Sequence, residues 1–163
     1  MVRKNYCKRY RNAGFTLLEL LIVLAIMGII GAVALPRLGH LQADWELEKT
    51  VQLVVAEIRH TRQTAITSRR TCRILFYNQV DAYRVLTPGD SNFIWLPDNI
   101  NIAYNNFPLY QSGNYRILTF NQNGAPNQGG TLGLSNERGD ILYIILYLGS
   151  GRIRISEDPP ENW

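Results

Sequence analysis

The longest apolar segment of this chain spans residues 15–35 and contains a single charged residue, Glu19. An α-helix needs roughly 20 residues of this kind to cross the hydrocarbon core of a bilayer. Five basic residues and no acidic residue precede the segment, and this asymmetry predicts a cytoplasmic N-terminus. The pattern therefore predicts a single-pass membrane helix, residues 15–35, followed by a domain outside the cytoplasm.

A second helical pattern continues from Pro36 to about Ser68. Apolar and small side chains recur there at spacings of three and four, which places them on one face of a helix. These side chains are Leu47, Val51, Val54, Ile58, Thr61 and Ala65. Proline lacks a backbone N–H and clashes with the preceding turn, so Pro36 should kink or open the helix, and Gly28 weakens the same half.

From residue 71 onward the hydrophobic pattern has a period of two, and the segments become short. It predicts strands at 71–77, 82–86, 93–96, 101–104, 115–120, 131–134, 141–147 and 152–156. Residues 78–81 and 148–151 are predicted hairpin turns. A long helix followed by seven or eight strands predicts an α+β fold, with residues 36–70 packing on an antiparallel head, residues 71–156. Residues 157–163 read as a tail.

The N-terminus does not fit an ordinary secretory signal, whose cleavage site follows its apolar core. Here the candidate cleavage point, between Gly14 and Phe15, precedes the core. Cleavage there would remove residues 1–14 as a basic leader and leave the apolar helix attached to the rest of the chain.

Residues 14–20, Gly-Phe-Thr-Leu-Leu-Glu-Leu, resemble the class III signal of type IV pilins and type II secretion pseudopilins. The resemblance implies cleavage between Gly14 and Phe15 by a prepilin peptidase and N-methylation of Phe15. It also implies that Glu19 pairs with the Phe15 amine of a neighbouring subunit during assembly, and that residues 28–36 can unwind inside filaments. A carboxylate in hydrocarbon costs at least ~2–3 kcal/mol, so such residues usually have a partner and a function. The alternative for Glu19 is a tolerated polar residue near the membrane edge, neutralised or snorkelling.

The later part of the chain resembles the GspH/FimT class of minor pseudopilins. Gly-Thr-Leu-Gly-Leu at 130–134 and Gly-Arg-Ile-Arg-Ile at 151–155 carry this resemblance, together with the helix end at 62–66 and the strand at 73–76. It implies a pilin-like fold over most of the chain, although residues 91–114 contribute no motif.

Arg152 and Arg154 lie two residues apart in a predicted strand, so both should project from the same face. Paired guanidinium groups suit phosphate recognition, and FimT-like pilins that bind DNA during natural transformation carry a similar Gly-Arg-x-Arg sequence. The alternative is a solvated strand face or a contact between subunits. Further candidates for one basic patch are Arg69, Arg70, Arg73, Arg84 and Arg116.

The net charge of +4 arises mainly from the predicted leader, which holds five of the 17 basic residues and none of the 13 acidic ones. Its removal leaves 12 basic against 13 acidic side chains, which argues against broad electrostatic attraction to DNA. Cys7 leaves with the leader, so Cys72 has no disulfide partner within the chain and is expected to be a small buried hydrophobe.

No arrangement of residues indicates catalysis, a metal or a cofactor. The two histidines, His40 and His60, lie on the predicted helix outside any metal-binding spacing, and Ser150 lacks the surroundings of a nucleophile. We expect a non-enzymatic protein on which a peptidase acts.

Three hypotheses remain. The first is a structural subunit of a type II secretion pseudopilus or a type IV pilus. It would contact the prepilin peptidase, the inner membrane and the helices of other pilin-like subunits. The second is a DNA-binding pilin that acts through Arg152 and Arg154, and the third is a single-pass anchor that never assembles.

Overall fold

The computed structural model describes residues 16–110 and 113–159, without the side chains of residues 33–41. The chain divides into two compact units between Gly39 and His40. The predicted leader, the cleavage point between Gly14 and Phe15, and the last four residues of the predicted tail lie outside the described residues.

Helix α1 (Leu17–Ser68) contains 52 residues. Thr16 caps its start, because the Thr16 Oγ1 atom accepts a hydrogen bond from the Glu19 N–H at 3.2 Å. Glu19 therefore occupies the first turn, where the helix dipole stabilises a negative charge. The helix ends at Ser68, and Arg69 then adopts a left-handed φ of 52°.

The backbone of α1 is helical without interruption through Gly28 and Pro36. The local opening predicted from Pro36 is therefore not present over Leu17–Ser68, where intact turns on both sides flank the missing N–H. The unwinding of residues 28–36 that the resemblance implies concerns assembled filaments, and it stays a prediction.

Among the described residues, no helix combines the length and the apolar character needed to cross a membrane. Phe15 and the side chains of residues 33–35, which belong to the predicted span, lie outside the description. The span itself stays a prediction.

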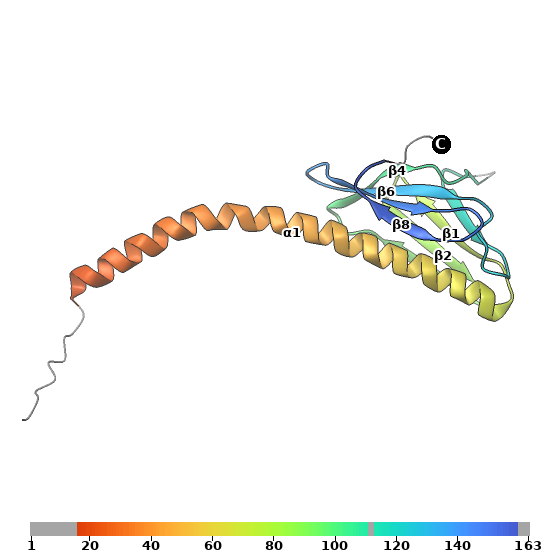
Figure 1. The fold of residues 1–163 in the computed structure, drawn as a ribbon, viewed down its shortest axis with the longest axis horizontal. Helices are drawn as coiled ribbons and strands as arrows, with labels where there is room; N and C mark the ends of the chain where they lie inside the picture. The colour runs from red at the N-terminus through yellow and green to blue at the C-terminus, as the bar shows by residue number, and fades with distance from the viewer. Residues whose placement is uncertain (1–15, 111–112, 160–163) are drawn as a thin grey trace, which may run out of the picture. The chain divides into compact units, whose positions relative to one another are not determined.

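The strands form two four-stranded sheets in which all neighbours are antiparallel (Figure 1). The first sheet has the order β3-β2-β1-β5 and contains β1 (Cys72–Tyr77), β2 (Ala82–Thr87), β3 (Asp90–Trp95) and β5 (Arg116–Phe120). The second has the order β4-β6-β7-β8 and contains β4 (Ile100–Asn105), β6 (Gly130–Asn136), β7 (Ile141–Leu146) and β8 (Ile153–Ser156).

One core joins the later half of α1 to the inner faces of both sheets. All six helix positions that the sequence placed on one face are buried. The five apolar ones share a hydrophobic core with Ile74 and Phe76 of the first sheet and Leu134 and Ile144 of the second. The predicted α+β fold is thus confirmed, and Cys72 is a fully buried free thiol at the start of β1.

The turn between β1 and β2 fastens the two sheets together. The Asp81 carboxylate accepts a hydrogen bond from the Ile102 N–H of β4 at 2.6 Å. The backbone carbonyl of Asp81 accepts another from the Leu96 N–H at 2.9 Å. Strand β3 begins at Asp90, three residues before the predicted start. Gly89, with φ of 94°, completes a tight turn there that the Pro88-Gly89 dipeptide signals.

Candidate functional site

The first half of α1 exposes large apolar side chains along its described length. Leu17 is 76% exposed, Met27 66% and Ile29 68%. Such a surface needs lipid or other apolar helices to cover it. Glu19 is the single acidic residue among the described positions before Asp44, and it lies beside the Thr16 cap. The cap uses only the backbone N–H of Glu19, so the pairing of its carboxylate with a neighbouring amine stays a prediction.

Gly28 has open space around the position that a Cβ atom would occupy. Nothing in the described part of the chain therefore requires a glycine there. Pro36 lies within the helical backbone, but its side chain is outside the description.

Arg154 lies in the second sheet's edge strand, β8, and Arg152 lies one residue before that strand; both are exposed. Ile153 and Ile155 alternate with them and pack against the core. The predicted shared face is therefore present. The Arg152 guanidinium lies 5.8 Å from the centre of the Tyr147 ring, a cation–π arrangement. Whether these arginines bind DNA stays a prediction.

Gly151 precedes this pair and has a structural reason to be glycine. Its φ is 62°, and a Cβ atom there would lie 3.2 Å from the Arg62 guanidinium carbon. The Arg62 Nε donates to the Gly124 carbonyl at 2.9 Å, and its Nη1 donates to the Gly151 carbonyl at 3.5 Å. Arg62 thus fastens α1 to two separate turns, a role that its place in the helical pattern did not reveal.

The other candidate arginines lie on different elements from Arg152 and Arg154. Arg84 stands over the Phe93 ring at 5.2 Å, and Arg116 donates to the Phe107 carbonyl. Both belong to strands of the first sheet, whereas β8 belongs to the second. Three exposed arginines instead gather just after α1, namely Arg69, Arg70 and Arg73.

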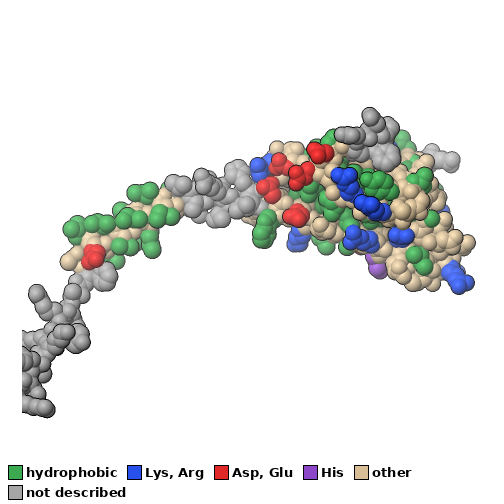
Figure 2. Space-filling model, in the orientation of Figure 1, with side chains coloured by type: hydrophobic (Ala, Val, Ile, Leu, Met, Phe, Trp, Pro, Cys, Tyr) green, Lys and Arg blue, Asp and Glu red, His purple; other side chains and the backbone are tan. Residues whose placement is uncertain are grey.

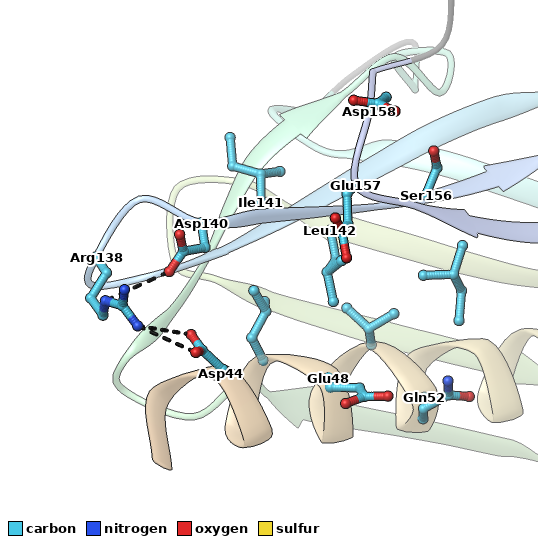
Figure 3. Close-up of a pocket in the computed structure, with 13 residues that line it drawn as sticks. Asp44, Glu48, Gln52, Arg138, Asp140, Ile141, Leu142, Ser156, Glu157 and Asp158 are labelled. Atoms are coloured by element: carbon cyan, nitrogen blue, oxygen red, sulfur yellow. Dashed lines mark hydrogen bonds and ion pairs between the residues drawn. The ribbon is translucent and has the colours of Figure 1, made fainter. Parts of the chain in front are cut away.

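A groove of about 840 Å³ runs between α1 and the β7–β8 edge of the second sheet (Figure 3). Its apolar lining comes from Leu47, Val51, Ile141, Leu142 and Ile155. Carboxylates surround this lining, from Asp44, Glu48, Asp140, Glu157 and Asp158. We call this site the acidic groove. The sequence did not reveal it, because its lining residues on α1, 44–52, and its remaining lining residues, 138–158, are more than 80 residues apart in the chain.

Arg138 is the one basic residue that lines the acidic groove. Its Nη1 lies 3.1 Å from Asp44 Oδ1 and its Nε lies 3.8 Å from Asp140 Oδ2. Figure 2 shows how acidic side chains gather where α1 enters the head, while basic side chains lie mainly farther along the visible face. Acidic and basic side chains are therefore separated along α1 on this face of the head.

A long N-terminal helix with an exposed apolar first half, packed by its second half on antiparallel sheets, defines a pilin-like subunit. The fold is similar to that of the type IV minor pilin FimU of Pseudomonas aeruginosa strain PAO1. The TM-score is 0.50 at 14% sequence identity, over 68% of this chain and 88% of that chain.

Sequence comparisons give the more specific assignment. Residues 9–35 match the prokaryotic N-terminal methylation motif. The chain is 30% identical to competence protein ComGD of Bacillus subtilis strain 168, over 91% of this chain and 96% of ComGD. It is 27% identical to type II secretion system protein H of Pseudomonas aeruginosa, over 93% of this chain and 87% of that protein. The chain therefore belongs to the family of pilin-like minor pseudopilins that includes ComGD.

Proposed function

We propose that this pseudopilin is cut between Gly14 and Phe15 and then built into a filament through the first half of α1. The observation that carries the proposal is the exposed apolar surface of residues 17–30, which holds one carboxylate in its first turn. Methylated Phe15 would begin the mature chain. Glu19 would pair with the Phe15 amine of a neighbour, since a carboxylate among apolar helices requires a partner.

Before assembly the precursor would reside in the inner membrane through residues 15–35, with its N-terminus in the cytoplasm and its head outside. The basic leader supports this orientation. The relatives include a competence protein and type II secretion proteins, so the proposal covers a filament of either kind. The similarity to ComGD extends over nearly the whole length of both chains, so a competence filament is the first system to test.

The test combines mass spectrometry with shearing of filaments from cells that express the prepilin peptidase and the remaining subunits. We expect the sheared chain to lack residues 1–14 and to carry one added methyl group. Gly14→Asp should leave the precursor in the membrane fraction, whereas Asn12→Asp adds the same charge to the leader and should still be processed. Uncut Gly14→Asp chain in sheared filaments at the native level would refute the proposal.

DNA binding is the second candidate function, and the exposed Arg152 and Arg154 pair favours it. The acidic groove counts against it, because Glu157 and Asp158 directly follow the same strand and repel phosphate.

Titration of DNA with the full chain in detergent, at several salt concentrations, separates the two functions. A DNA-binding pilin should bind more weakly as salt rises and lose most binding in an Arg152→Ala/Arg154→Ala double variant. The double variant Lys49→Ala/Arg59→Ala removes two exposed charges from α1 and serves as the control. Equal binding by the two variants would exclude a specific role for β8.

A further inference from the structure

In the acidic groove, some apolar side chains at the edge of the head's core are incompletely buried. Val51 is fully buried and Leu47 is 3% exposed on the helix side, but Leu142 and Ile155 on the sheet side are only partly buried. Covering such apolar side chains with a partner removes them from water and stabilises the complex. The groove therefore fits an occupant that brings some apolar surface.

The charges around the groove indicate which sign of charge the occupant carries. Arg138 pairs with Asp44 and Asp140 at one end. Farther along, Glu48, Glu157 and Asp158 make no ion pair with another described residue. Figure 3 shows Glu48 on α1 opposite Glu157 on the sheet side. These carboxylates favour a cationic partner.

This chain carries such a partner in residues 66–73, which we call the basic turn. Arg69, Arg70 and Arg73 are exposed there, and Ile66 is 39% exposed. No acidic residue occurs from position 58 to position 80. Within the described part of the chain, none of these three arginine side chains has a hydrogen bond or an ion pair. The basic turn thus combines unpaired cations with an apolar side chain.

One chain cannot bring its own basic turn into its own acidic groove. Glu48 and Ser68 lie on the same helix, and 20 residues correspond to roughly 30 Å along the axis. Two different surfaces at opposite ends of a domain can join only between copies. Repeated contacts of this head-to-tail kind form a closed ring when the rotation between copies closes, and an open helical filament when it does not.

We propose that the acidic groove of one subunit receives the basic turn of a second copy, with Arg69 and Arg70 meeting Glu48 and Glu157. This contact deepens the proposed function, since it names the surface through which adjacent heads join in a filament. The chain's own last four residues are a poorer occupant, because they contain Glu161 and no cation.

A disulfide crosslink between two differently tagged full-length copies in detergent tests the contact. One copy carries Gln52→Cys in the groove and the other carries Ser68→Cys beside the basic turn, both with Cys7→Ser. A mild oxidant should crosslink this pair. The pair of Gln52→Cys with Gln79→Cys, an exposed position in the β1–β2 turn, should crosslink about five-fold less. Equal yields from the two pairs would overturn the proposal.

Charge exchange supplies the decisive result. Glu48→Arg/Glu157→Arg in the first copy should lower the crosslink yield about five-fold, and so should Arg69→Glu/Arg70→Glu in the second copy. Combining the reversed groove with the reversed turn should restore most of the yield. Asp98→Arg and Arg59→Glu, at exposed positions outside both surfaces, are the matched controls.

A failure to restore the yield would overturn the proposal. So would a several-fold gain in a chain that ends at Pro159, because it would assign the groove to the chain's own tail. Neither result bears on filament assembly through α1, because the crosslink is measured on purified chains. Loss of processing or of filament incorporation would instead refute the proposed function and leave the crosslink unaffected.

Discussion

At the scale of single residues, the contact between Arg62 and Gly151 shows why the Gly-Arg-x-Arg sequence begins with glycine. Arg62 joins α1 to the Gly124 and Gly151 carbonyls, and the guanidinium occupies the space next to the Gly151 Cα atom. The glycine of this motif is therefore explained by packing within the head, whatever the two following arginines bind.

The first prediction concerns Gly151→Ala. Both Gly151 and Gly149 have positive φ, of 62° and 85°, but only the Gly151 substitution meets the Arg62 guanidinium within 4 Å. Each change should cost about 1 kcal/mol in backbone strain, and Gly151→Ala should cost about 1 kcal/mol more. Thermal or urea unfolding checks this difference. The excess should vanish in an Arg62→Ala background, and its persistence there would contradict the assigned contact.

The second prediction concerns Tyr83, which is 6% exposed. Burial, with a smaller contribution from the Glu57 charge, raises the pKa of Tyr83 from 10.0 to about 12. The folded state holds this proton more tightly, so its contribution is complete below pH 10 and is lost as the pH rises from 10 to 12. Two pKa units correspond to roughly 2–3 kcal/mol.

Urea unfolding at pH 9 and pH 11.5 measures this effect. The native chain should lose more stability over the interval than Tyr83→Phe does. Tyr110→Phe, at a ring that is 43% exposed, controls for the loss of a hydroxyl group. Identical losses in the native chain and in Tyr83→Phe would show that Tyr83 does not contribute to alkaline unfolding.

At the scale of elements, the later half of α1 is the surface on which both sheets assemble. Ile58 is 1% exposed within the core, while Leu53 on the same helix is 58% exposed. We predict that Ile58→Ala lowers the free energy of unfolding by about 2–5 kcal/mol, because it leaves a cavity. Leu53→Ala should change it by less than about 0.5 kcal/mol. Urea titration followed by circular dichroism distinguishes them, and equal losses would contradict the assigned core face.

The helix face and the approximate strand positions could be predicted from the sequence because each depends on local periodicity. Leu47 and Ala65 belong to one 3.6-residue stripe, and in β5 the buried Leu118 and Phe120 lie two residues apart, as a period of two requires. The turns predicted at 78–81 and 148–151 are also local signals, and the strands beside them pair as β1–β2 and β7–β8 hairpins. The pairing of β1 with β5, about 40 residues later, could not be predicted in this way. The role of Arg62 and the acidic groove also depend on contacts between distant segments, which local patterns do not encode.

At the scale of the whole molecule, most of the positive net charge comes from the predicted leader, and the rest of the chain is almost neutral. Its acidic and basic side chains lie in different places. Acidic side chains surround the start of the head's part of α1, and exposed arginines follow its end. Separated charges of opposite sign favour contact between subunits over uniform attraction to a polyanion. The polarity of the head thus agrees with a structural subunit more closely than with a general DNA-binding surface.

The central claim is that Glu19 joins subunits by its charge. We predict that Glu19→Gln leaves the processed chain in the membrane fraction and lowers its amount in sheared filaments at least about ten-fold, because a buried charge pair loses one partner. Thr16→Ala, which removes the helix cap and keeps the carboxylate, separates the two roles of the first turn and should still assemble.

The most direct measurement is therefore the ratio of filament to membrane protein for the native chain, Glu19→Gln and Thr16→Ala in the same cells. We expect a low ratio for Glu19→Gln alone. A native ratio for Glu19→Gln, with cleavage after Gly14 intact, would contradict it.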